Sequence, residues 1–173
     1  MNTFLLFDLF FWAFTALLVG AALFDVCRFV IPNWISLALV GLFAAAVFVH
    51  PVSIDWLSHL GAMAVVLVAM LVAYRFRVVG GGDLKLVAAV ALWIGLGALP
   101  QLLLVIALAG GAFALGIMVL RRVVTMLVIA QPFYETVTLP RLLLPGESIP
   151  YGVAIAVGGL WVARGLPHLG QFV

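Results

Sequence analysis

Long apolar runs separated by short breaks dominate the pattern of the chain. A helix that crosses a hydrocarbon core of about 30 Å needs roughly 17–25 largely apolar residues. The breaks contain proline or glycine, which suit turns at a membrane surface. By this rule we predict six transmembrane helices, near residues 4–24, 34–49, 56–74, 84–99, 102–120 and 149–163.

Composition favours a membrane protein over a soluble one. Of the 173 residues, 68% are hydrophobic and only 8% are charged, and a soluble fold of this size could not cover so much apolar surface. Helices satisfy their own backbone hydrogen bonds in lipid, so we predict one all-α domain over residues 1–173. The net charge of +2 is too small to indicate a nucleic-acid partner.

The basic residues predict the orientation of the chain. With six helices, three connections lie on one side of the membrane, and of the 8 Lys and Arg residues only Arg164 lies opposite. By the positive-inside rule these connections face the cytoplasm, and both termini face the other side. The longest connection, 121–148, contains apolar patches and is predicted to lie along the membrane surface in contact with lipid.

Two acidic residues stand out by their positions. Asp25 directly follows the first apolar run, and Asp83 closes the run Gly80–Gly81–Gly82 and opens the fourth helix. Both would lie at the cytoplasmic boundary, where an ionisable group is costly unless it faces protein or water. Two carboxyl groups can hydrolyse a peptide bond without a metal or cofactor, because one takes a proton from water while the other polarises the carbonyl. We therefore expect them to form a catalytic pair.

Helix position predicts unequal roles for the pair. Asp83 begins a helix, where the helix dipole favours an anion, whereas Asp25 lies near a helix end, where the dipole opposes one. We therefore expect Asp83 to be the base and Asp25 to hold the proton. The glycine run would permit positive φ and close backbone approach. A simple helix cap at Asp83 and a flexible glycine turn remain open alternatives.

The other polar candidates fit ordinary structural roles. Four acids are expected to be, in order, a headgroup-level carboxylate, a helix cap and two solvated side chains: Asp8, Asp55, Glu135 and Glu147. The three histidines and one cysteine are dispersed, so we expect no metal site, cofactor or catalytic histidine among them: His50, His59, His168 and Cys27.

The two acidic segments resemble those of the prepilin peptidases, a family of intramembrane aspartyl proteases. Residues 80–83 have the Gly-x-Gly-Asp form, and Lys85 follows at that family's spacing. Residues 25–33, an Asp followed by a short stretch and Ile-Pro-Asn, resemble its first catalytic segment. Residues 149–152, Ile-Pro-Tyr-Gly, resemble its closing segment.

The resemblance implies that Asp25 and Asp83 are catalytic and that the substrate is a prepilin or pseudopilin precursor. The family removes a short basic leader, after a glycine and before the precursor's hydrophobic helix. The implied location is the bacterial inner membrane, with the active site facing the cytoplasm. The short chain resembles the peptidases of Flp-type, tight-adherence pili, and it lacks the cysteine-paired insert of the larger members. N-methyltransferase activity is therefore not expected.

The neighbouring motif residues have softer expectations. Lys85 and Arg28 would each orient the pair or bind the substrate, or else reach the membrane interface as ordinary basic side chains. Pro32 and Asn33 would shape the turn into the second helix, with Asn33 as its N-cap.

Two other functions stay open at this point. A non-catalytic assembly subunit of a pilus or secretion system would tolerate loss of both acids. A small transporter is disfavoured, because such proteins use polar groups near the middle of the membrane and this chain has almost none there. The sequence also leaves open an archaeal origin, a homo-oligomer and the need for a partner protein.

Overall fold

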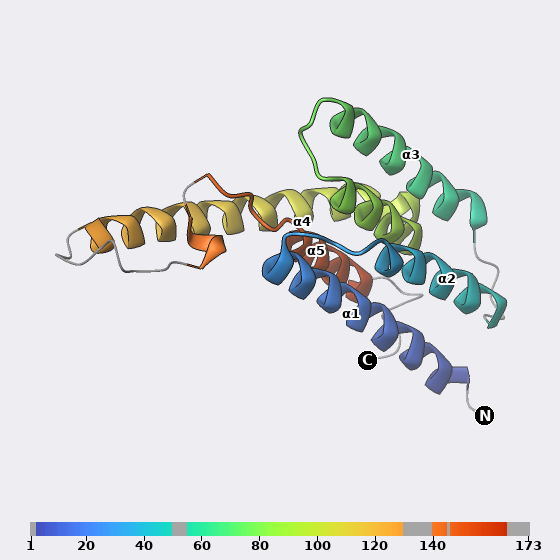
Figure 1. Cartoon of the computed structure of the whole chain (residues 1–173). Coiled ribbons are helices and arrows are strands. Elements are labelled where there is room, and N and C mark those ends of the chain that lie inside the picture. The colour runs from blue at the N-terminus through green and yellow to red at the C-terminus, as the bar shows by residue number, and fades with distance from the viewer. Residues whose placement is uncertain (1–2, 50–54, 130–139, 145, 166–173) are drawn as a thin grey trace.

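The computed structural model describes residues 3–49, 55–129, 140–144 and 146–165, and Figure 1 shows their arrangement. This part of the chain holds five α-helices and a short 3-10 helix, with no strand among the described residues: α1 Thr3–Arg28, α2 Asn33–Val49, α3 Trp56–Arg75, α4 Gly81–Ile129, η2 Arg141–Leu143 and α5 Gly152–Gly165. The predicted all-α class is confirmed.

Among the described helices, three are long and apolar enough to cross a membrane, at Leu9–Arg28, Trp56–Arg75 and Gly81–Leu127. The helices α2 and α5 are also apolar but shorter, with 17 and 14 residues. These lengths make the chain a multi-pass membrane protein. The six crossings and the side on which the termini lie stay predictions.

The predicted fourth and fifth helices are two legs of one element, α4. The break between them is at Gly95, whose φ of 76° and ψ of 172° are not helical. Figure 1 shows the chain reversing direction between the green leg and the yellow and orange leg. Pro100 lies inside the second leg, close to its start, where a missing N–H removes little of the hydrogen-bond ladder. The break predicted between residues 99 and 102 was therefore wrong, since the turn lies at Gly95.

Two side chains of α3 replace the backbone hydrogen bond that this break removes. In an unbroken helix the N–H of Leu96 would donate to the carbonyl of Leu92. Here the Leu96 N–H donates to Ser58 Oγ at 3.0 Å, and the Leu92 carbonyl accepts from His59 Nδ1 at 2.7 Å. Both backbone groups have partners, which permits a sharp turn inside an apolar bundle.

The first leg of α4 is the centre of the bundle. Every residue from 86 to 95 is buried, because α2, α3 and α5 all pack against α4. The indole N–H of Trp93 donates to the Leu39 carbonyl at 2.9 Å, and its ring packs against Phe14 and Phe43 with centroids 4.9 and 5.6 Å apart. A helix surrounded in this way is apolar on all faces.

Helix α5 packs closely on its neighbours through glycines. A Cβ at Gly158 would lie 2.5 Å from the Ile106 side chain, and one at Gly159 would lie 2.9 Å from that of Leu18. Small residues let membrane helices approach each other, since lipid is as apolar as the side chains. The short, glycine-rich sequence of α5 is therefore suited to a tightly enclosed helix.

The second leg of α4 continues past the predicted end at residue 120 and reaches Ile129. At about 1.5 Å per residue the leg is about 50 Å long, which exceeds a hydrocarbon core of about 30 Å. Figure 1 shows its orange end extending beyond the other helices. Residues 121–129, predicted as part of a surface connection, are therefore helical. Outside the described residues lie 130–139 of that connection, which include Glu135, and also His50 and His168.

Candidate active site

Asp25 lies in the last turn of α1, and its side chain faces the start of α5. The residue is only 7% exposed, and its Oδ2 accepts a 2.6 Å hydrogen bond from the backbone N–H of Gly152, the first residue of α5. The first N–H groups of a helix have no partner within that helix, so a carboxylate is favoured there. Asp25 thus links the last turn of α1 to the first residue of α5.

This contact changes the predicted asymmetry of the two acids. The expectation for Asp25 assumed that it faces only the C-terminal end of α1, which opposes an anion. That assumption was wrong, because the N-terminal end of α5 also faces its carboxyl group through Gly152. The carboxyl groups of both acids therefore face a helix N-terminus, although Asp25 itself lies in the last turn of α1, and helix position no longer indicates which one is the base.

Asp83 lies in the first turn of α4 and is half-buried. Its carboxyl group accepts a hydrogen bond from the backbone N–H of Gly80, while the Leu84 N–H donates to the Gly80 carbonyl at 3.1 Å. An acid that reaches back from the third helical position to the residue before the helix is a common N-terminal cap. Asp83 therefore does cap α4, as one of the alternatives predicted, and this hydrogen bond fixes the direction of its carboxyl group.

The structure brings the two acids together although they are 58 positions apart in the sequence. The Gly82–Ile31 contact and the Lys85–Asn33 hydrogen bond hold the segments of the two acids side by side, and the carboxyl groups lie close enough at one end of the bundle for their charges to interact. Asp25 is held by α5 and Asp83 by the Gly80 loop. Each acid therefore has its own backbone donor.

The glycine run works through close contact and not through positive φ. Among the described glycines, positive φ occurs at Gly95 and Gly146, so the run 80–82 does not use the positive φ that glycine permits. A Cβ at Gly82 would lie 3.1 Å from Ile31 Cβ and 3.5 Å from the Ile31 backbone, and one at Gly81 would lie 3.5 Å from the Tyr74 ring. Gly82 therefore lets the segment before Asp83 pack directly on the segment after Asp25.

Lys85 and Asn33 form a second link between these segments. Lys85 Nζ donates to Asn33 Oδ1 at 2.8 Å. Asn33 is itself the first residue of α2, so its described contact differs from the predicted N-cap. Both side chains are exposed, and the Lys85 ammonium group keeps donors for a ligand after this bond.

Arg28 and Pro32 lie on either side of the turn between α1 and α2. The Arg28 guanidinium is 5.4 Å from the centroid of the Phe24 ring, which is the geometry of a cation–π contact. The Pro32 carbonyl accepts from the Ile35 N–H at 3.1 Å at the start of α2. The described contacts of Arg28 and Pro32 are therefore structural and do not include either acid.

The segment before α5 is attached by Arg121, one of the basic residues that predicted the orientation of the chain. Its Nε and Nη1 donate to the carbonyls of Leu142 and Glu147, both at 2.9 Å, and its Nη2 to that of Ser148 at 3.4 Å. The Arg141 guanidinium lies 5.0 Å from the ring centroid of Phe29, four residues after Asp25. This segment therefore lies beside the end of α1 and leads into Gly152.

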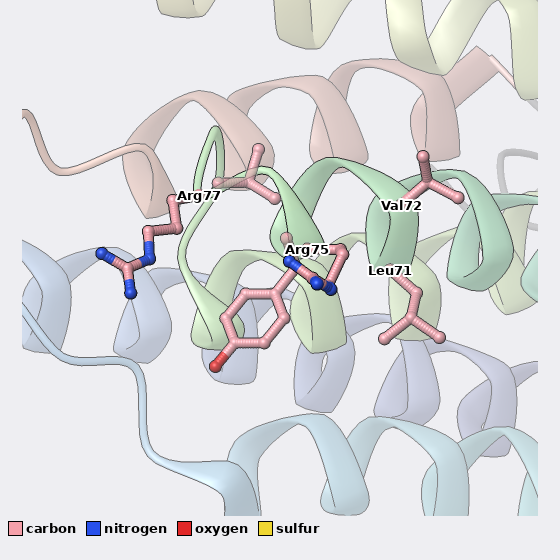
Figure 2. Close-up of a pocket in the computed structure, with 6 residues that line it drawn as sticks. Leu71, Val72, Arg75 and Arg77 are labelled. Carbon is pink, nitrogen blue, oxygen red and sulfur yellow. The ribbon is translucent and has the colours of Figure 1, made fainter.

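Tyr74, Arg77 and Val79 help to line a hollow of about 790 Å³ beside the loop that leads to the glycine run. Figure 2 shows Arg77 on this loop and Leu71, Val72 and Arg75 on the last turns of α3.

Arg77 has a φ of 58°, and the Arg77 and Val78 N–H groups donate to the carbonyls of Tyr74 and Ala73, respectively. That pattern is a Schellman helix end, at which glycine is the usual residue.

Of the four other acids, Asp55 fits its prediction and Glu147 does not. Asp55 caps α3 and accepts from the Ser58 N–H at 3.2 Å. Glu147, predicted to be solvated, pairs with Arg141 at 3.2 Å. The side chain of Asp8 and the whole of Glu135 lie outside the described part. Within that part, no three His, Cys, Asp or Glu residues gather as metal ligands.

Comparison with known proteins identifies the family of this chain. Residues 12–115 match the type IV leader peptidase family. The chain therefore belongs to the type IV leader peptidase family. The part that matches this leader peptidase family contains Asp25, residues 80–83 and Lys85, whereas Gly152 lies beyond it.

Two curated relatives have the name "Prepilin leader peptidase/N-methyltransferase" and come from Aeromonas salmonicida, one of them from strain A449. Each is 32% identical to this family member over 110 residues. The alignment covers 60% of the chain but only 31% of each relative. No solved structure matches the chain.

Proposed function

We propose that this chain is a prepilin leader peptidase of the aspartic type. The observation that carries the proposal is the approach of Asp25 and Asp83, which the sequence motifs predict as a pair and which interact electrostatically. Both acids lie in the part of the chain that matches the family. The names of the two relatives support a leader-peptidase activity.

The reaction needs one ionised and one protonated carboxyl group. The ionised group takes a proton from water as the oxygen attacks the scissile carbonyl, and the protonated group donates a hydrogen bond to the carbonyl oxygen. Collapse of the tetrahedral intermediate breaks the C–N bond, and the amine leaves with a proton. Two nearby carboxyl groups favour this mixed state, because their repulsion opposes ionisation of both. Asp25 and Asp83 exchange roles in this scheme without changing the products.

The substrate that fits is a precursor whose cleavage point lies at the membrane boundary. Both acids are at helix ends, beside the loops that follow Arg28 at the end of α1 and Arg75 at the end of α3, the second of which contains Arg77. By the positive-inside rule these loops face the cytoplasm, so we place the site at the cytoplasmic face of a bacterial inner membrane. A basic leader would remain in water there while the apolar helix after it enters lipid. The short connection between α1 and α2, which has no room for the cysteine-paired insert of the larger peptidases, supports a Flp-type precursor as the substrate.

Co-expression with a candidate Flp-type precursor tests this function. Wild type is compared with Asp25→Ala and Asp83→Ala by the size shift of the precursor, and Asp55→Ala is the matched control because Asp55 only caps α3. We expect each active-site variant to lose at least about a thousandfold in rate, as for removal of one member of a catalytic unit. Equal processing by wild type and both variants would refute the assignment and favour a non-catalytic assembly subunit.

A further inference from the structure

A groove opens between α2 and α3 beside the acidic pair. Both helices pack against α4 but hardly against each other. Between them lies a cavity of about 330 Å³. We call it the α2–α3 groove, and its apolar lining comes from all three helices: Leu37 and Val40, Met63 and Leu67, and Ala88 and Ala89.

The groove begins where the candidate active site ends. The end of the groove nearest the acids is lined by Lys85 and Asn33, and Lys85 follows Asp83 by two residues on α4. From there the lining follows α4 to Ala89 and α2 to Val40. Seven residues of α2 rise about 10 Å, so the groove is about two helical turns long. A chain bound at the acidic pair would enter the bundle along this path.

One polar side chain in the groove has no partner. Ser36 is 7% exposed, it lines the groove, and its Oγ makes no hydrogen bond within the described structure. A buried hydroxyl without a partner is unfavourable, and such groups are uncommon in folded proteins. The position of Ser36 therefore points to a ligand that brings a hydrogen-bonding group into an otherwise apolar groove.

We propose that the α2–α3 groove binds the first two turns of the substrate's apolar helix, just beyond the scissile bond. The inference rests on the proposed peptidase function and adds the place where the substrate is held. The small side chains of Ala88 and Ala89 let a helix approach closely. A lipid acyl chain would fill the apolar lining but offers nothing to the Ser36 hydroxyl, whereas a peptide offers backbone and side-chain polar groups.

Crosslinking tests the position of the substrate. The probe is a model precursor with a short basic leader, a glycine and an apolar helix of about twenty residues, retained by an Asp25→Asn/Asp83→Asn variant. A photoreactive benzoylphenylalanine replaces Leu67 in the groove or, as the matched control, Val68, which is the next residue on α3 and is 63% exposed. We expect a precursor adduct at Leu67 and none at Val68. Equal adducts, or lipid adducts alone at Leu67, would overturn the proposal.

Kinetics test the same groove in the active protein. Val40→Trp fills the groove from its rim and should raise KM about tenfold, whereas Val68→Trp should match wild type. Ser36→Ala should lower kcat/KM about fivefold, the effect of one lost hydrogen bond, without lowering the unfolding temperature. If wild type cleaves the precursor and both groove variants do so equally well, the groove proposal fails and the peptidase remains. If wild type does not cleave, the peptidase function fails and the groove proposal fails with it.

Discussion

The contact between Gly152 and Asp25 yields the sharpest prediction about the site. An ideal Cβ at Gly152 would lie 2.9 Å from Asp25 Oδ2, 3.0 Å from its Cβ and 3.2 Å from its Cγ. Ordinary van der Waals contact begins at about 3.4 Å. Gly152→Ala therefore forces the carboxyl group to move by about half an ångström or to rotate away from its 2.6 Å hydrogen bond.

The expected effect is on activity more than on folding. Catalytic groups must be held within about 0.5 Å of their working positions, and a 1 Å displacement can cost about a hundredfold in rate. The displacement expected here is about half of that, so we expect Gly152→Ala to reduce leader cleavage by about tenfold. Alanine is the better helix former by about 1 kcal/mol, which offsets part of the crowding, so the protein should still insert and fold.

The assay follows the size shift of a precursor incubated with purified protein in detergent. Gly116→Ala in α4 is the matched control, because a Cβ at that position meets no atom within 4 Å. The control should cleave at the wild-type rate and gain the same helix propensity. Full activity in Gly152→Ala would refute the reasoning, since Asp25 would then tolerate displacement from the N-terminus of α5.

Three further substitutions test other parts of the fold. Gly95→Ala should lower the free energy of unfolding by about 2 kcal/mol, because φ at this position is 76° and the new Cβ would lie 3.3 Å from Ser58 Oγ. Denaturant titration in micelles measures this, and an unchanged free energy of unfolding would contradict a strained backbone at Gly95. Arg77→Gly should raise that free energy by about 1 kcal/mol, because glycine has no penalty at positive φ, and a decrease would disprove the Schellman assignment. Arg121→Ala should make amide exchange in residues 142–148 about fivefold faster, while Arg122→Ala should not, and equal rates would show that Arg121 does not hold the segment.

The helices and the acidic pair could be predicted because their signals are local. Apolar runs of membrane-spanning length give helices whatever surrounds them, and α1, α2 and α3 begin and end within a few residues of their predicted limits. The pair followed from topology, since Asp25 and Asp83 lie at helix ends that a hairpin arrangement brings to one side. Their motifs then added the family.

The break in α4 could not be predicted, because its cause lies in another helix. Pro100 is the stronger local signal for a break, yet the turn is at Gly95 because Ser58 and His59 supply the partners for its free backbone groups. No pattern around Gly95 indicates those partners. The same limit applies to Asp25, whose donor at Gly152 is 127 positions away.

The role of α5 was also hidden in the sequence. Glycine weakens an isolated helix, so a short glycine-rich run is a poor helix signal. In the structure, Gly158 and Gly159 are contact points with Ile106 and Leu18. The glycines of α5 are present because the helix packs closely on its neighbours. Local helix propensity alone gives the same signal for such a helix as for a weak one.

The non-acidic motif residues gain a common explanation from the bundle. Apolar packing alone specifies little between helices in lipid, because the surrounding chains are equally apolar. Relative position must then come from polar bonds and close backbone contacts. Lys85 bonds to Asn33, and Gly82 packs on Ile31, so two contacts hold the turn after α1 against the start of α4. Two acids on separate helices need such a fixed junction if their carboxyl groups are to meet a single peptide bond.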